Sequence, residues 1–263
     1  MASSVSIPAQ FNGPPGTGHG GYSCGRFAAF VPLRAAEGVG AASVASVAAV
    51  EVTLRRPPPV ETEIDVVSGH DQIREVRFEH DGALVAEARG TQLDIDALAI
   101  PRPPTMDEAL RAEQRSAFRR RHVDHPFPTC FGCGPLRTPE DGLRQWPGLL
   151  DDERAAASVW EPPSWTADGR AVRPEMVWAA LDCPGALGAM EQLGITLGDE
   201  PWVLGRMTAA QLQPVPLGDR YIILGWLRSR SGRKRAVASA LLSAGGVLLA
   251  AAEAVWVTLP GPG

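Results

Sequence analysis

Two short stretches of the chain carry residue types that could do chemistry on a carbonyl group. His19-Gly20-Gly21 opens a predicted helix over 19–30, and Asp182 lies near the end of a second predicted helix over 173–184. Backbone N–H groups at the start of a helix stabilise negative charge that develops on oxygen, and glycines let a reacting group approach that backbone closely. A carboxylate can act as a general base or as a nucleophile. These stretches are therefore the first candidates for a catalytic site.

Each stretch also has a simpler structural interpretation. His19-Gly20-Gly21 could be a Gly-rich turn into a core helix, with His19 only capping that helix. Asp182 could be a polar residue at a helix end, because Cys183-Pro184-Gly185 is expected to break the helix. An acid is electrostatically disfavoured at the C-terminal end of a helix, so this position predicts a specific partner for Asp182. Both interpretations stay open at this level.

The two candidate helices have equivalent places in two halves of the chain. A Pro-rich segment over 101–104 interrupts regular structure, and Thr105 and Glu108 then form a capping box that begins a connecting helix reaching to about Arg121. On either side of this connector the sequence repeats a Gly/Pro-rich opening, a short apolar helix and a run of long strands. We therefore expect a diverged tandem duplication with an N-terminal domain over 1–104, a linker helix over 105–125 and a C-terminal domain over 126–263.

The expected strands form an antiparallel meander in each half. A sheet with one apolar face and a single helix to cover it predicts an α+β fold in which the sheet wraps around the helix. The strands are expected over 50–54, 62–67, 75–80 and 84–93 in the first half, with a turn at Asp81-Gly82, and over 204–213, 221–228, 235–242 and 247–259 in the second, with a turn over 244–246.

This order of elements resembles the hotdog superfamily of thioesterases and dehydratases, in which a curved antiparallel sheet wraps a central helix and two such units pair. Gly18-His19-Gly20-Gly21 resembles the His-Gly-Gly that opens the central helix in the phenylacetate-type acyl-CoA thioesterase branch. Cys130-Phe131-Gly132-Cys133-Gly134-Pro135, followed by Gly142-Leu143, resembles the entry strand of related thioesterase-like proteins. The resemblance implies a tandem double hotdog in which one chain supplies both units.

The resemblance also implies that the site is divided between the halves. In that branch an acidic residue nine positions after the histidine acts as nucleophile or general base. Nine positions after His19 stands Ala28, whereas nine positions after Arg173 stands Asp182. The first half thus keeps the glycines without the acid, and the second keeps the acid with Arg-Pro-Glu in place of His-Gly-Gly. Pro174 has no backbone N–H, so one active site per chain is expected instead of two.

Helix geometry restricts how such a divided site could work. A carboxylate nine residues into a helix lies about 13 Å from the start of that helix, too far to serve its own N-terminus. Asp182 could act on a thioester held at Gly20 and Gly21 if the two helices pack side by side and antiparallel. The implied activity is acyl-CoA thioester hydrolysis, with Asp182 as general base or nucleophile and His19 orienting the carbonyl. The alternative is a non-catalytic acyl-CoA or lipid-binding protein of the same fold.

Further candidate residues concern the binding of the substrate. Asn12 stands where a polar residue contacts substrate or the acid in some related enzymes, although a turn at Asn12-Gly13 is the simpler interpretation. The basic run over 228–235 falls at a strand-to-strand turn, where Arg230, Arg233 and Lys234 could bind the phosphates of coenzyme A, or could form a solvated hairpin tip. Coenzyme A enters only as part of the substrate, and no separate cofactor is expected.

Several other classes of function are disfavoured by the sequence. Cys130 and Cys133 form a CxxC with His122 and His125 nearby, but no second ligand pair stands at zinc-finger spacing, and no metal is expected. The formal net charge of -5 leaves no basic surplus for a nucleic-acid backbone. The chain contains no P-loop, dinucleotide-binding fingerprint or nucleophile elbow.

The overall composition predicts a globular protein of the cytoplasm. Four irregularly spaced cysteines are few for a secreted disulfide framework, so free thiols are expected. The sequence has neither a basic, apolar leader nor an apolar run long enough to span a bilayer. The outer face of a hotdog sheet usually seeks a partner, which implies a homo-oligomer. Four tryptophans are expected in core or interface packing: Trp160, Trp165, Trp178 and Trp202.

Overall fold

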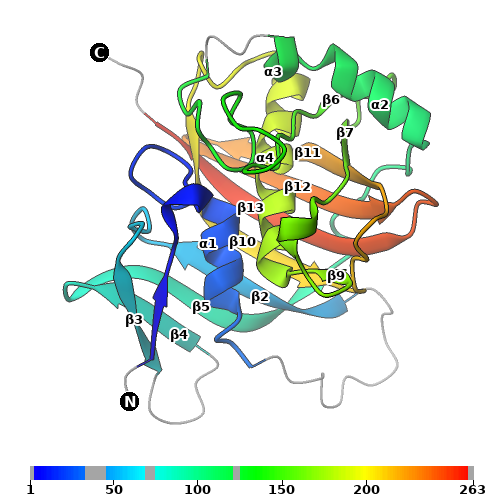
Figure 1. The fold of residues 1–263 in the computed structure, drawn as a ribbon. Helices are drawn as coiled ribbons and strands as arrows, with labels where there is room; N and C mark the ends of the chain where they lie inside the picture. The colour runs from blue at the N-terminus through cyan, green and yellow to red at the C-terminus, as the bar shows by residue number, and fades with distance from the viewer. Residues whose placement is uncertain (1–2, 33–45, 69–74, 121–124, 260–263) are drawn as a thin grey trace.

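The computed structural model describes residues 3–32, 46–68, 75–120 and 125–259. Their strands form one antiparallel sheet of eleven strands, in the order β1-β3-β4-β5-β2-β10-β13-β12-β11-β7-β6, and a separate two-stranded ribbon of β8 and β9. The first five strands in this order come from the N-terminal half of the chain and the other six from the C-terminal half. Figure 1 shows the two halves side by side, with one helix of each half on the same face of the sheet.

The first half consists of a twisted meander and one short helix. Its elements are β1 (Ser3–Ser6), the 3-10 helix η1 (Ala9–Phe11), α1 (Gly20–Ala28), β2 (Ser46–Leu54), β3 (Glu63–Ser68), β4 (Glu75–His80) and β5 (Ala83–Asp94). The predicted helix and all four predicted strands are present within a few residues of their expected bounds. The Asp81-Gly82 turn is also confirmed, with both residues in the left-handed region (φ 49° and 71°) that a two-residue hairpin requires. The edge strand β1, which pairs with β3, was not predicted.

The second half repeats this plan with a longer helix. Its four predicted strands are confirmed as β10 to β13, whereas the short strands β6 to β9 were not predicted. Its elements are β6 (Gly148–Leu149), β7 (Ala156–Trp160), the 3-10 helix η3 (Ser164–Thr166), β8 (Ala167–Asp168), β9 (Ala171–Val172), α4 (Pro174–Leu193), β10 (Trp202–Gln211), β11 (Tyr221–Ser231), β12 (Lys234–Ser243) and β13 (Leu248–Thr258).

Pairing of β2 with β10 joins the halves into one sheet. These strands are antiparallel, with Val52 opposite Met207 and Val50 opposite Ala209. All four side chains are buried, so the joint is part of the core. One hydrophobic cluster lies on the face of the sheet that carries α1 and α4, and includes residues of both halves. The structure is therefore the tandem double hotdog that the sequence predicted, with a helix of each half against its own strands.

Helix α4 runs straight through the point where the sequence predicted its end. Cys183-Pro184-Gly185 was expected to break the helix, but α4 continues to Leu193 and ends at Gly194, which has a left-handed backbone (φ 67°). Every residue from Met176 to Met190 is buried, so tertiary packing compensates for the hydrogen bond that Pro184 cannot donate. The interpretation of Asp182 as a residue at a helix end is therefore wrong, because Asp182 lies in the middle of α4.

Close backbone packing against β11 accompanies this continuation of α4. Gly225 of β11 lies directly beneath Pro184, so that a Cβ added to Gly225 would overlap the Pro184 carbonyl. One turn later, a Cβ added to Gly188 would overlap the backbone of Gly225. Two glycines that face each other thus let the helix axis approach the strand, as only residues without side chains allow.

The connector between the halves is a helix on the opposite face of the sheet. Helix α2 (Met106–Arg115) begins with the predicted capping box of Thr105 and Glu108. It ends earlier than the predicted Arg121, because Ser116 has an extended backbone (ψ 132°) and a separate short helix follows, α3 (Ala117–Arg120). Ala109 and Ala112 of α2 belong to a second buried cluster on this face, with Ile222 and Leu224. The linker is thus a packed layer of the fold.

The segment that begins the second half is a loop and not the predicted entry strand. Residues 128–135 form turns, with the Cys130 carbonyl accepting from Gly134 at 2.8 Å. Phe131 instead bridges the halves, because its N–H donates to the Asn12 carbonyl at 2.7 Å and its carbonyl accepts from Leu143 at 2.9 Å. These bonds replace a strand ladder.

Among the described helices, none is long and apolar enough to cross a membrane.

The glycine contact beneath α4 yields a test of the fold. Gly225→Ala should destabilise the protein by about 1–3 kcal/mol or more, because the new methyl group meets backbone atoms that cannot move aside. Chemical denaturation with both variants would measure the effect. Gly245→Ala is the matched control, since the nearest atom to its added Cβ lies 3.8 Å away. Equal stability of the two variants would contradict this account of how α4 packs.

Candidate functional site

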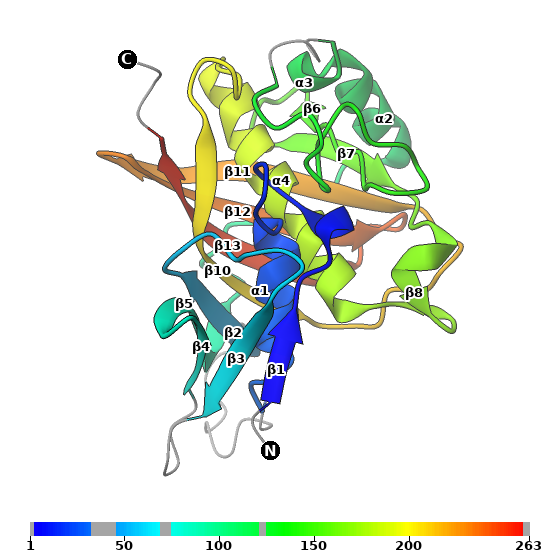
Figure 2. The ribbon, with the colours of Figure 1, turned by 60° about the vertical axis from the view of Figure 1, so that its left-hand side comes forward.

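The predicted carboxylate and the predicted helix start lie against each other. Asp182 of α4 accepts a hydrogen bond through Oδ2 from the backbone N–H of Gly21, at 2.6 Å. One turn before Asp182, the Trp178 carbonyl also faces Gly21, whereas Gly25 faces Glu175. Later residues of α1 therefore contact earlier residues of α4, so the two helices are antiparallel. A site divided between the halves requires this orientation. Figures 1 and 2 show them next to each other in two views.

Two glycines one turn apart make this contact between α1 and α4 possible. A Cβ added to Gly21 would overlap the Asp182 side chain and the Trp178 carbonyl, and one added to Gly25 would lie 2.6 Å from the Cα of Glu175. Small residues at this spacing allow two helix backbones to approach closely. The one-turn spacing of Gly21 and Gly25 is visible in the sequence, but Gly25 was not predicted to contact the second helix.

His19 lies beside Asp182 and caps α1. Its Nδ1 accepts from the Tyr22 N–H at 3.2 Å, which places His19 at the N-cap position. Its Nε2 lies 3.5 Å from Asp182 Oδ2 and 3.2 Å from Cys183 Sγ. Because Nδ1 acts as an acceptor, the neutral imidazole carries its proton on Nε2. His19 thus presents an N–H donor to the carboxylate and to the neighbouring thiol.

Burial and the neighbouring charged groups act in opposite directions on the pKa values of Asp182 and His19. Asp182 is 2% exposed, and its Oδ1 has no hydrogen-bond partner among the described residues. Burial raises the pKa of Asp182 to about 6, although His19 and the Gly21 amide act to lower it. Burial lowers the pKa of His19, but the neighbouring Cys130 and Asp182 raise it by more, so it lies above its ordinary value. A carboxylate with a pKa near neutrality is suited to proton transfer.

The first turn of α1 offers one free backbone donor. The amides of Gly21 and Tyr22 bond to Asp182 and His19, whereas the Gly20 amide donates to no acceptor in the described part of the chain. Gly20 also lines the cavity described below. Of the two amides predicted to form the oxyanion site, only that of Gly20 is therefore free to donate to a substrate oxygen. The Gly21 amide instead holds the Asp182 carboxylate in place.

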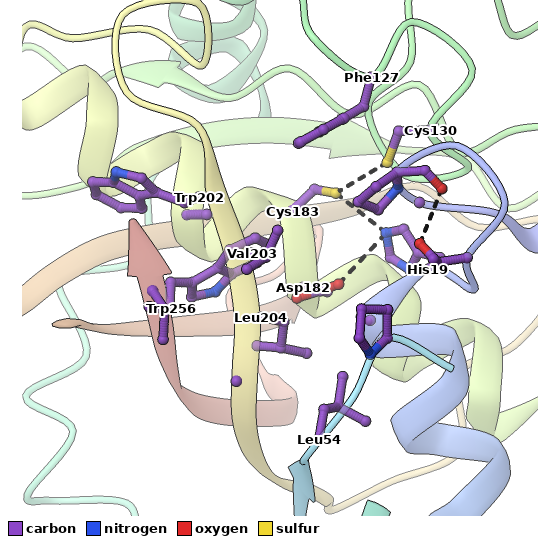
Figure 3. A pocket seen from close by; sticks show the side chains of 18 of the residues that line it. His19, Leu54, Phe127, Cys130, Asp182, Cys183, Trp202, Val203, Leu204 and Trp256 are labelled. Atoms are coloured by element: carbon purple, nitrogen blue, oxygen red, sulfur yellow. Dashed lines mark hydrogen bonds and ion pairs between the residues drawn. The ribbon is translucent and has the colours of Figure 1, made fainter. Parts of the chain in front are cut away.

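A cavity of about 410 Å³ lies between the two halves beside this cluster. Its volume is within the range of sites for small organic ligands. Figure 3 shows Asp182 and His19 at one part of its wall and Trp202 and Trp256 at another. Trp202 was expected to be a core residue, and it is both buried and part of the cavity wall. The wall is mostly apolar and includes Leu54, Phe127, Ala186, Leu187, Leu197, Val203, Leu204 and Val257.

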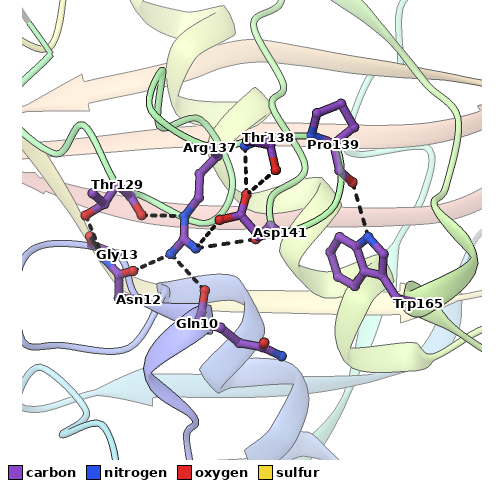
Figure 4. A network of polar contacts seen from close by, with 9 residues as sticks. All are labelled: Gln10, Asn12, Gly13, Thr129, Arg137, Thr138, Pro139, Asp141 and Trp165. Carbon is purple, nitrogen blue, oxygen red and sulfur yellow. Dashed lines mark hydrogen bonds and ion pairs between the residues drawn. The ribbon is translucent and has the colours of Figure 1, made fainter.

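Asn12 holds the two halves together at another place. Its Oδ1 accepts from Arg137 Nη2, and its Nδ2 donates to Thr129 Oγ1 at 3.2 Å (Figure 4). Arg137 also donates to the carbonyls of Gln10 and Thr129, each at 2.8 Å. Asn12 is not among the residues that line the cavity. Its contact with substrate therefore remains a prediction that this geometry does not support.

The predicted phosphate-binding residues lie on a hairpin next to the cavity. Arg230, Arg233 and Lys234 are exposed at the β11–β12 turn and do not line the cavity, but Lys234 pairs with Val257, which does. The structure adds Arg55 and Arg56, which line the cavity itself and are both exposed. Sequence analysis missed this pair, although two arginines directly before a Pro-rich turn were a visible signal.

Three cysteines also line the cavity. They are Cys130 and Cys133 of the loop at the start of the second half and Cys183 of α4, and each is buried. The Sγ atoms of Cys130 and Cys183 lie 3.9 Å apart. Sequence analysis considered only the CxxC pair, because nothing in the sequence connects Cys183 with a loop 53 residues away.

Part of this thiol cluster could in principle hold a metal ion. His19, Cys130 and Cys183 place their ligand atoms within 4.8 Å of one another. However, the Nε2 atom of His19 that faces the thiols carries the proton of the neutral ring, because Nδ1 accepts from Tyr22. This arrangement disfavours a metal at that nitrogen.

In the predicted CxxC and histidine cluster, His125 Nε2 lies 3.4 Å from Cys133 Sγ, and His122 lies outside the described residues.

Comparison with known proteins yields matches to solved structures alone. No model of a protein family and no curated protein sequence matches this chain. The tesB protein of Mycobacterium avium subspecies paratuberculosis is 13% identical, with a TM-score of 0.53, over 97% of this chain and 91% of that one. A conserved protein of unknown function with a hotdog fold, from Alicyclobacillus acidocaldarius, is 14% identical, with a TM-score of 0.54, over 99% and 93%.

A plant enzyme extends the same likeness. The 12:0-ACP thioesterase of Umbellularia californica is 12% identical to this chain, with a TM-score of 0.50, and the match covers 98% of this chain and 94% of that one. Such low identities establish the fold and nothing finer. Since these matches cover nearly the whole of each chain, and one of the matched proteins is described as having a hotdog fold, they support the tandem double-hotdog fold of this protein.

Proposed function

We propose that this protein hydrolyses an acyl thioester, with acyl-CoA as the expected substrate, in the cavity between its two hotdog units. The observation that carries the proposal is the position of Asp182. A buried carboxylate with a pKa of about 6, one of whose oxygens has no hydrogen-bond partner among the described residues, lies over the first turn of an antiparallel helix, at the wall of an apolar cavity. Burying an unpaired acceptor costs free energy, so a residue that serves packing alone is a poor explanation.

In this proposal α1 supplies the donor that stabilises the oxyanion, and α4 supplies the base or nucleophile. The thioester carbonyl lies at the start of α1, where the Gly20 amide donates to the oxygen that becomes negative. Asp182 removes a proton from the attacking water, which displaces the thiolate of coenzyme A as the C–S bond breaks, or it attacks the carbonyl itself, expels that thiolate and forms a mixed anhydride that water then cleaves. The Nε2–H of His19 is close enough to Asp182 to orient the carboxylate or the substrate carbonyl.

The cavity and its surroundings suit the two parts of an acyl-CoA. The apolar wall formed by Leu204, Trp256 and their neighbours would hold the acyl group. Arg55 pairs with Glu87 at 2.6 Å, whereas Arg56 is exposed and makes no ion pair within the described part of the chain. Arg56 and the basic hairpin with Arg230 are therefore candidates for the phosphates of coenzyme A, which stay at the surface.

Hydrolysis of a panel of short, medium, long and aromatic acyl-CoAs, read by release of free thiol, tests this proposal. Asp182→Asn should lower kcat/KM on the best substrate by about a hundredfold to ten-thousandfold, because an amide cannot accept the proton of water. Glu175→Gln is the matched control, as it changes another carboxylate of α4 that does not line the cavity. Full turnover by Asp182→Asn would rule out the proposed role of Asp182.

Binding measured on the same panel separates the enzyme from the alternative function. If no acyl-CoA is hydrolysed while the esters still bind, with Asp182→Asn binding as tightly as the unchanged protein, the chain is an acyl-CoA or lipid-binding protein of this fold. Isothermal titration calorimetry with each ester would show this directly. If the esters neither bind nor react, acyl-CoA itself is the wrong class of ligand.

The raised pKa of Asp182 predicts how hydrolysis depends on pH. The reactive form is the carboxylate, so kcat/KM, corrected for spontaneous hydrolysis, should rise with pH and reach half its plateau near the pKa of about 6. A carboxylate with the ordinary pKa of 3.8 would give no rise in this region. A flat profile of kcat/KM from about pH 5 to about pH 8 would contradict the assignment.

Stability offers a test of Asp182 that does not depend on substrate. The folded-state pKa of about 6 exceeds the ordinary 3.8, so the folded state is favoured while the carboxyl is protonated, and this advantage is lost as pH rises through about 6. The difference corresponds to about 3 kcal/mol of stability. Asp182→Asn should therefore raise the free energy of unfolding near about pH 7.5 and have little effect near about pH 4. A loss of stability at both pH values would indicate a structural carboxylate.

A further inference from the structure

The function proposed above leaves three thiols of the cavity wall without a role. Cys130, Cys133 and Cys183 are between 3% and 5% exposed, yet all three line the cavity. The fourth cysteine, Cys24 of α1, is fully buried and does not line it. A small reagent that enters the cavity can therefore reach three of the four thiols. Figure 3 shows Cys130 and Cys183 directed toward each other next to His19.

The distance between two of these thiols is short enough for a bond to form with little movement. Cys130 and Cys183 have their Sγ atoms 3.9 Å apart, against about 2.05 Å in a disulfide. Cys130 belongs to a loop of turns, which can adjust more easily than the buried helix that carries Cys183. Cys133 also neighbours Cys130, but its Sγ has a further contact, with His125 Nε2 at 3.4 Å.

The surroundings of Cys130 also favour its reactive form. The neighbouring thiols of Cys133 and Cys183 and the ring of His19 lower the pKa of Cys130 well below its ordinary value, against the effect of burial. The same contact with Cys130 raises the pKa values of Cys133 and Cys183. The thiolate is the nucleophile in thiol oxidation, so Cys130 is the member of the cluster that should react first.

We propose that Cys130 and Cys183 form an oxidisable thiol pair on the cavity wall, which a hydroperoxide converts into a disulfide. The Cys130 thiolate attacks the terminal oxygen of the peroxide, so that an S–O bond forms and the O–O bond breaks; the peroxide is reduced, and hydroxide leaves from hydrogen peroxide or alkoxide from an alkyl hydroperoxide. The Cys183 sulfur then attacks the resulting sulfenic acid. An S–S bond forms, the S–O bond breaks, and the departing hydroxide takes the thiol proton of Cys183 as water.

The disulfide would act directly on the candidate site. Cys183 follows Asp182 in the chain, and its Sγ contacts His19 Nε2 at 3.2 Å. A Cβ added to Gly132 would lie 2.6 Å from both Cys183 Sγ and His19 Nε2, so the loop that carries Cys130 already packs on these atoms. Drawing the two sulfurs together would disturb that packing. Oxidation should therefore lower thioester hydrolysis, and this consequence alone rests on the proposed function.

Peptide mapping after peroxide treatment tests the pair. The reduced full-length protein is titrated with hydrogen peroxide, remaining thiols are alkylated, and the chain is digested without reduction. The expected product is a cross-linked pair of peptides with Cys130 and Cys183, formed with the loss of two thiols per chain and reversed by dithiothreitol. A bond between Cys130 and Cys133, or four unreacted thiols after treatment, would overturn the proposal.

Two variants make the result specific to this pair. In Cys183→Ala, the sulfenic acid of Cys130 should persist and be trapped by dimedone, because no resolving thiol is left at that position. Cys24→Ala should give the same cross-linked peptides as the unchanged protein. Dimedone labelling at Cys133 in place of Cys130 in Cys183→Ala would also contradict the proposed order.

Hydrolysis is measured separately on the same samples, so that failure of the proposed function is not confused with failure of this inference. Activity should fall in proportion to the disulfide and return with dithiothreitol. Activity that stays constant while the disulfide accumulates would overturn the effect on the site. If no ester is hydrolysed even by the reduced protein, the peptide map still decides whether the pair forms.

Discussion

The close approach of α1 and α4 is the constraint on which the rest of this structure depends. Gly21 and Gly25 bring the two helix backbones together, and only at this distance can the Gly21 amide bond to Asp182 at 2.6 Å. The two helices come from different halves of the chain, and the paired strands β2 and β10 hold those halves in one sheet. The sheet joint fixes where the helices lie, and the glycines fix how near they come. The site follows from both.

The same contact explains the unusual state of Asp182. Burial between the two helices raises the pKa of the carboxylate to about 6, and the Gly21 amide and the His19 side chain compensate for this burial only in part. A fully satisfied network would have kept the pKa low, whereas removal of both partners would have raised it further. The intermediate pKa of Asp182 is suited to a base that works near neutral pH, and the burial that produces it lowers the stability of the fold.

Sequence analysis predicted those parts of the fold and site that local patterns determine. The eight long strands, both central helices and the capping box at Thr105 depend on alternation, turns and capping signals that neighbouring residues carry. That Asp182 would lie near Gly20 and Gly21 of the opposite helix was inferred from a family resemblance together with helix length, whereas its direct bond with the Gly21 amide was not predicted. By contrast, the course of α4 through Pro184 was missed, because the glycine of β11 that accommodates it lies 41 positions further along the chain. The loop at Cys130 was mistaken for a strand, since its bonds are made with Asn12.

Differences between the two helix starts also explain why one candidate site, and not two, is expected in this chain. The antiparallel helices place Gly25 of α1 against Glu175 at the start of α4, where a second copy of the site would lie. Ala28 supplies no carboxylate there, Pro174 supplies no amide donor, and Arg173 pairs instead with Glu175 at 3.4 Å. Helix α4 is instead buried from Met176 to Met190, and this burial holds Asp182 over the candidate site at the start of α1.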